Sequence, residues 1–94
     1  MDKEINYYGG IGQGNIVLRM VLRERERQDS LWGNQSHHSD AWWNVIASEE
    51  NGEVAKEVYE RNTDKLLVEV IQACAVYFAW AEALVERDAN EKNG

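Results

Sequence analysis

The stretch from Glu49 to Gln72 constrains this chain most, because it places carboxylates on the apolar face of an expected helix. A helix turns by about 100° per residue, so six positions share one side: Trp43, Ile46, Glu50, Glu53, Val54 and Glu57. A buried carboxylate is costly unless it is paired, protonated or bound to a metal. We therefore expect function where the acidic residues interrupt the apolar stripe.

The composition predicts one small folded domain, with 94 residues and an apolar content of 44%. The formal net charge of −7 argues against duplex nucleic acid as a partner, because such a surface needs clustered basic residues. An acidic chain can still bind a polyphosphate when divalent cations neutralise both partners. The single cysteine, Cys74, excludes an internal disulfide and fits a reducing compartment.

The most apolar run, Leu66–Leu84, is long enough to cross a membrane, but it carries Glu69, Gln72 and Glu82. Carboxylates inside a bilayer are costly, which argues against a membrane span. Residues 1–4 are mostly charged, and no apolar segment of the kind found in signal peptides follows them. These features favour a cytoplasmic protein with no membrane partner.

The pattern of apolar residues predicts an all-α fold with three principal helices. Residues 1–14 contain four glycines and are expected to form a flexible N-terminal arm. Asn15 is the expected cap of the first helix. The second helix is expected at about Ala41–Arg61, after a cap at Ser39 or Asp40.

The third helix is expected at about Asp64–Arg87, after a break at Asn62–Asp64. The segment Asp29–Asp40 has the composition of a loop. Residues 89–94 form a polar tail, so the folded domain is expected at 15–88.

The third helix is apolar on nearly all sides, because Ile71, Ala75 and Phe78 lie opposite Val76 and Trp80. A helix of this kind is normally buried all round. A chain with three helices cannot easily cover it, so we expect an oligomer.

Single residues in this sequence have more than one interpretation. Trp32 either anchors the loop to the core or stacks on a base, and anchoring is the commoner role of a buried aromatic ring. The pair His37–His38 lacks a partner at zinc-ligand spacing, which argues against zinc. Gly52 within a helix suggests close approach of another helix or a ligand. Cys74 lies among small apolar residues and is expected to be buried.

The acidic residues of the second and third helices are expected to meet if these helices pack antiparallel. Glu69 and Gln72 lie about two to three helical turns after the break. Glu50 and Glu53 lie about as far before it. Such oxygen donors are the ligands that Mg²⁺ prefers, with water and substrate phosphates completing its shell. These oxygen donors would suit Mg²⁺ or Mn²⁺, but for acidic residues taken alone a solvated flank that forms ion pairs is the commoner role.

These motifs resemble those of the MazG-like, all-α nucleoside triphosphate pyrophosphohydrolases. The family pattern is Glu-x-x-Glu, a spacer, and Glu-x-x-Asp, matched here by Glu50 with Glu53 and by Glu69 with Gln72. The likeness to short members of phage and mobile-element type covers roughly Arg23–Leu84 and includes further segments: Arg25–Asp29, Trp32–Gly33, His38, Asp40, Trp43, Val54–Lys56 and Gln72–Trp80.

The resemblance implies cleavage between the α- and β-phosphates of a nucleoside triphosphate, with release of pyrophosphate and a nucleoside monophosphate. This activity would clear unwanted nucleotides from the cell. By the same resemblance, Glu50, Glu53 and Glu69 would hold the metal, and Glu49 would be a nearby base. A homodimer or homotetramer whose subunits complete each other's sites is also implied.

Gln72 departs from the family pattern, because it stands where the pattern has Asp. The missing charge leaves open a catalytically impaired nucleotide-binding or helical interaction module on the same scaffold. A third interpretation is a solvated acidic flank that pairs with Lys56, Arg61 or Lys65. If the chain does bind a nucleotide, Lys56 and Arg61 are candidates for phosphate contact.

Overall fold

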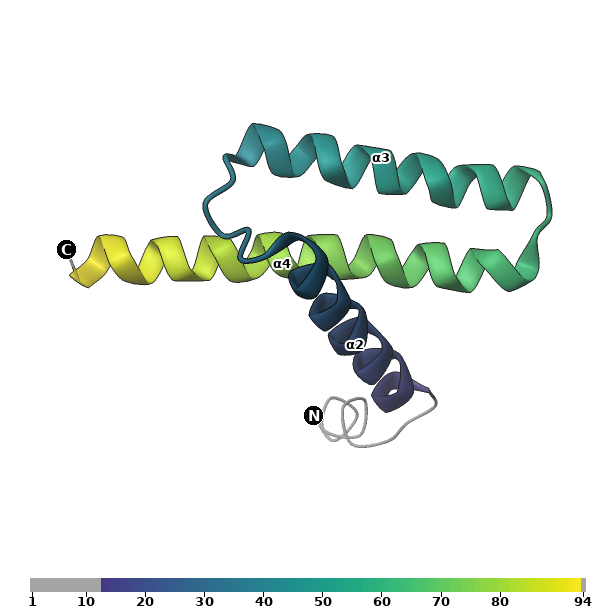
Figure 1. Ribbon diagram of the computed structural model, residues 1–94, viewed down its shortest axis with the longest axis horizontal. Helices are drawn as coiled ribbons and strands as arrows, with labels where there is room; N and C mark the ends of the chain where they lie inside the picture. Colours follow the sequence, from purple (N-terminus) through teal and green to yellow (C-terminus); the bar gives the residue numbers. More distant parts are fainter. Residues whose placement is uncertain (1–12, 94) are drawn as a thin grey trace, which may run out of the picture.

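The computed structural model describes residues 13–93, and in this part of the chain it contains three α-helices and no strand. These helices are α2 (Gly14–Trp32), α3 (Asp40–Tyr59) and α4 (Thr63–Asn93). Helices α3 and α4 run antiparallel side by side, and α2 crosses α4 obliquely (Figure 1). The expected all-α class is confirmed, while the expected arm lies outside the described residues except for Gln13 and Gly14.

Helix α2 differs from the prediction at both ends. It begins at Gly14, one residue before the expected cap at Asn15, and the preceding Gln13 makes no capping hydrogen bond through its side chain. It continues to Trp32, where Gly33 follows with a φ of 76° and donates its backbone N–H to the carbonyl of Asp29 at 2.7 Å. Glycine adopts this left-handed conformation without strain. The loop is therefore shorter than expected and spans residues 33–39.

Helix α3 begins as the sequence predicts. The hydroxyl of Ser39 accepts a hydrogen bond from the backbone N–H of Trp42 at 3.2 Å, which satisfies a donor of the first helical turn. Asp40 adds a negative charge to that turn, where the helix dipole favours it. The interpretation of Ser39 as a cap is thus confirmed.

A tight turn separates α3 from α4. The backbone N–H groups of Arg61 and Asn62 donate to the carbonyls of Val58 and Glu57 at 3.1 and 3.0 Å. Arg61 adopts a left-handed φ of 58°, which lets the chain reverse within a few residues. This reversal makes α3 and α4 antiparallel (Figure 1), which is the arrangement that the predicted acidic site requires.

Helix α4 is longer than expected and ends at Asn93 instead of near Arg87. Residues 88–93 contain Ala, Glu and Lys, which favour helix, and no proline. Lys92 also pairs with Asp88 one turn earlier, at 3.2 Å. The expected polar tail is therefore helical as far as Asn93.

The core lies on two sides of α4, as the sequence pattern predicts. On one side, α3 and α4 form a cluster of buried residues: Trp43, Ala47, Val76 and Ala79. On another side, Val21 of α2 packs with Ile71 and Ala75 of α4. Among the described residues, one helix, Thr63–Lys92, is long and apolar enough to cross a membrane, with a mean hydropathy of 1.5. A core helix of a soluble protein has the same character.

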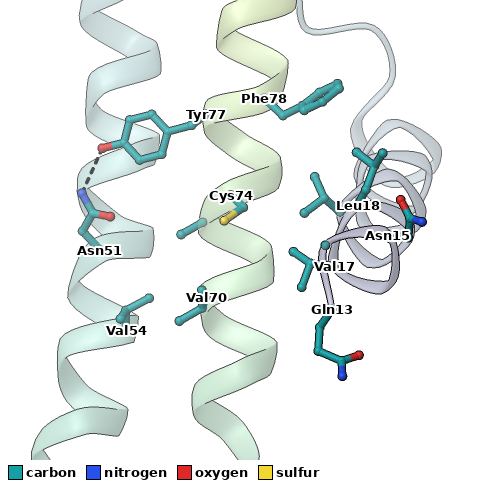
Figure 2. A pocket seen from close by; sticks show the side chains of 13 residues that line it. Gln13, Asn15, Val17, Leu18, Asn51, Val54, Val70, Cys74, Tyr77 and Phe78 are labelled. Atoms are coloured by element: carbon teal, nitrogen blue, oxygen red, sulfur yellow. Dashed lines mark hydrogen bonds between the residues drawn. The ribbon is translucent and has the colours of Figure 1, made fainter. Parts of the chain in front are cut away.

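An apolar groove of about 930 Å³ runs along α4 between α2 and α3 (Figure 2). Val17 and Leu18 line it from α2, and Val70 and Tyr77 line it from α4. The Tyr77 hydroxyl accepts a hydrogen bond from Asn51 of α3 at 3.0 Å. Tyr77 is 45% exposed, and Cys74 is exposed in the same groove, so the expected burial of Cys74 is wrong.

Candidate functional site

Glu50 of α3 is the centre of an acidic cluster, whose other members act on its pKa: Glu24, Glu49, Glu53 and Glu69. The side chain is half-buried, and its Oε1 atom is buried without a hydrogen-bond partner in the described part of the protein. Burial raises the pKa of this carboxyl, and the negative charges of Glu69 and Glu53 raise it further. Glu24 and Glu49 act in the same direction. Buried polar atoms are normally paired, so an unpartnered oxygen at this position is unusual.

The charge of Glu69 on α4 acts on the pKa of Glu50 on α3, so the antiparallel pair places these two carboxylates near one another. Glu53 and Glu49 are exposed on α3, whereas Glu69 is half-buried on α4. Gln72 is also half-buried and lies one turn after Glu69. Val76 packs against α3 and Ala75 packs against α2. By helical geometry, Gln72 lies between these two positions on the surface of α4.

Helix α2 adds an acidic residue to the cluster, Glu24, which the sequence interpretation missed. Glu24 acts on the pKa of Glu50 from α2, and its own side chain is 11% exposed. The signal was present in the spacing, because Val21, Glu24 and Gln28 recur on one face of a helix. The alternating charges of Arg23–Arg27 do not show from the sequence which of these residues belong to this face.

The carboxylate of Glu24 is held by two neighbours on its own helix. Arg27 donates from Nε to Oε1 at 2.9 Å and from Nη2 to Oε2 at 2.7 Å. The buried amide of Gln28 donates to the same Oε2 at 3.0 Å. The bond from Arg27 is the main reason why the pKa of Glu24 is lowered. Glu24 is therefore a charged and fixed oxygen donor at the edge of the cluster.

Arg25 fastens α2 to α4 beside this site. Its guanidinium donates to Asp29 on the same helix at 2.9 Å and to Glu82 of α4 at 2.9 and 3.3 Å. The side chain of Arg25 is only 16% exposed. Arg27 thus forms an ion pair within its own helix, with Glu24, whereas Arg25 also bridges two helices.

The residues considered for substrate contact are exposed. Lys56 is exposed in the last turn of α3, and Arg61 is exposed in the turn that follows. Trp32 is 61% exposed, so its expected anchoring of the loop is wrong within this chain. A Cβ atom added at Gly52 would meet nothing within 4 Å, so the described residues supply no close neighbour there.

The two histidines belong to the loop and its packing. His38 is half-buried, and its ring lies edge-on to that of Trp43, with 5.3 Å between the ring centroids. The Nε2 atom of His38 lies 3.2 Å from Oε1 of Gln35. Burial lowers the pKa of His38, and the neighbouring His37 lowers it further. This environment gives His38 a packing role at the start of α3.

The cluster has the donor chemistry of a site for a hard cation. Carboxylate and amide oxygens are the ligands that Mg²⁺ and Mn²⁺ take, and the buried Oε1 of Glu50 lacks a partner. Within residues 13–93, no three His, Cys, Asp or Glu side chains already converge as a metal-binding group. The fit to a cation therefore rests on donor chemistry and on the charge deficit at Glu50.

Comparison with known proteins finds no match: no family model matches the sequence, and no curated protein or solved structure matches the chain. The likeness to the MazG-like family therefore rests on the residues quoted above. What that likeness implies for activity is a proposal.

Proposed function

We propose that this protein is a Mg²⁺-dependent nucleoside triphosphate pyrophosphohydrolase of MazG-like type. The observation that carries the proposal is the carboxylate of Glu50, which has a buried, unpartnered oxygen and lies among the charges of four other glutamates. A cluster of this kind is unfavourable by itself and becomes favourable with a divalent cation. The similarity of the motifs to the MazG-like family supports this assignment.

Glu50, Glu53, Glu69 and Gln72 would hold the cation through their side-chain oxygens. A bound divalent cation supplies positive charge for the phosphates and lowers the pKa of water. Glu49 is exposed beside the cluster and can accept the proton of the attacking water. The water adds to the α-phosphorus and the α–β anhydride bond breaks. The products are a nucleoside monophosphate and pyrophosphate.

Gln72 supports a second candidate function. It is half-buried next to the cluster and brings no charge, so a site centred on it holds a cation less strongly than one with Asp. The chain would then bind a nucleotide or a helical partner without turnover. The two functions differ in product, since only the enzyme releases pyrophosphate.

We also propose that the protein is a cytoplasmic homodimer or homotetramer. The support is the apolar character of the groove and of the exposed α4 surface, where Leu67, Val68 and Val70 are 51%, 52% and 37% exposed. Large exposed apolar patches are typical of interfaces. Helices of a second copy can cover them.

The test is a pyrophosphate-release assay over a panel of ordinary and modified nucleoside triphosphates, with Mg²⁺ or Mn²⁺. Glu53→Gln is expected to abolish cation-dependent release. Glu60→Gln is the matched control, because it removes the same charge at an exposed position at the end of α3.

Release that is equal in Glu53→Gln and in the native protein would contradict the assigned cluster. If no nucleotide on the panel yields pyrophosphate but one raises the melting temperature, the binding function is supported instead.

A further inference from the structure

The arginines of α2 differ in how firmly the structure holds them. Arg25 bonds two carboxylates on two helices and is 16% exposed, so its release would break the link between α2 and α4. Arg27 bonds only Glu24, on its own helix, and is 50% exposed. Arg27 can therefore leave its partner without loss of a contact between helices.

Arg27 is linked to the acidic cluster through Glu24, because it binds the carboxylate of Glu24, and the charge of Glu24 raises the pKa of Glu50. The negative charge of Glu50 acts on its guanidinium, in addition to the direct bond with Glu24. Arg27 is thus bonded to a carboxylate that acts on Glu50.

The geometry of the Arg27–Glu24 pair matches the recognition of a phosphate. Both Nε and Nη2 donate to one planar carboxylate, at 2.9 and 2.7 Å. An arginine that uses two donors in this way binds phosphate with the same fork. Glu24 keeps its bond from the buried Gln28 when Arg27 departs, so the carboxylate is not left without a donor.

We infer that Arg27 binds the polyphosphate of the substrate, and that it moves from Glu24 to the phosphates once a divalent cation has neutralised the cluster. The inference rests on the proposed function and adds to it a phosphate-binding residue and an order of events. Without the cation, Glu24 and Glu50 attract Arg27 and repel the phosphates, so the anion is bound only with the cation present.

The test measures binding of inorganic triphosphate to the full chain by calorimetry, with and without Mg²⁺. Arg27→Gln is expected to weaken binding in Mg²⁺ by about tenfold or more, the usual effect of losing hydrogen bonds to a charged group. Arg27→Lys should recover part of the affinity, because it restores the charge without the fork. Arg23→Gln, an equal charge change at an exposed position on the same helix, should leave binding unchanged.

A direct titration with Mn²⁺ alone separates phosphate binding from loss of the cation. Arg27→Gln removes a positive charge beside the cluster, so its Mn²⁺ affinity should be equal to or higher than that of the native protein. Circular dichroism and thermal melting show whether the variant keeps its fold. A lower Mn²⁺ affinity in Arg27→Gln would overturn the inference, because the arginine would then support the cation site.

The remaining outcomes distinguish the inference from the function on which it rests. If native protein binds triphosphate with Mg²⁺ and Arg27→Gln binds it equally, the role of Arg27 is wrong and the hydrolase proposal is unaffected. If triphosphate binding depends on Mg²⁺ and Arg27 while no nucleotide is hydrolysed, the inference holds and catalysis is wrong. If the native protein binds neither cation nor triphosphate, both are wrong.

Discussion

At the scale of single residues, Glu50 carries a charge that its surroundings oppose. Burial and then the charges of Glu69 and Glu53 raise its pKa above the ordinary value of 4.5. Between the unfolded and the folded pKa, the carboxyl of Glu50 is therefore protonated in the folded state and ionised in the unfolded chain. The stability that Glu50 contributes is fully present below the unfolded pKa, and it is lost as pH rises through the folded pKa.

Glu50→Gln is therefore expected to stabilise the cation-free protein at pH 7. The gain is at most about 1 kcal/mol, because solvent screens a half-exposed cluster. Urea unfolding in the presence of a chelator measures it, and the difference from native protein should vanish near pH 4. Added Mg²⁺ should then stabilise the native protein and not the variant. A variant that responds to Mg²⁺ like the native protein would show that the cluster is an acidic flank and not a cation site.

At the scale of helices, the sequence predicts which elements exist better than where they end. The break before α4 and the cap of α3 were readable because Asn62–Asp64 and Ser39 carry strong local signals. The C-terminal end of α2 was not, because residues 29–32 have the composition of a loop and yet continue the helix. Weak propensity allows either outcome, and the bonds of Arg25 to Asp29 and Glu82 favour the helical one.

Ser39→Ala tests the element whose start is best defined. The hydroxyl of Ser39 accepts the N–H of Trp42, and loss of such a cap costs about 1 kcal/mol of stability. The free energy of unfolding should fall by this amount in urea titration. Ser36→Ala is the control, because Ser36 lies in the same loop and engages its backbone N–H, rather than its hydroxyl, with Asn34. Equal effects of the two substitutions would mean that the cap adds nothing to the stability of α3.

At the scale of the whole molecule, the antiparallel packing of α3 and α4 was a condition of the predicted acidic site. Helical periodicity predicted apolar residues on opposite sides of α4. It could not place α2 against the cluster, because five alternating charges at Arg23–Arg27 do not show which of them faces inward. Glu24 and Arg27 are identified only once Val21 is packed on Ile71 and Ala75. Periodicity also marks Cys74 and Tyr77 as apolar-face residues without showing whether this chain or another copy covers them.

If the groove is the interface of the proposed dimer or tetramer, one charged side chain placed in it should disrupt the assembly. Val70→Lys places a charge in the groove and is expected to convert a native dimer or tetramer into monomer, as measured by sedimentation velocity. Val58→Lys is the matched control, because Val58 is 58% exposed on α3 and does not line the groove.

Cys74, the only cysteine, gives a second measurement of the same assembly. Its reaction with a thiol reagent should be slow in the native assembly and fast in Val70→Lys. Native protein that sediments as a monomer, with Cys74 fully reactive, would leave the groove open to solvent and contradict the assembly.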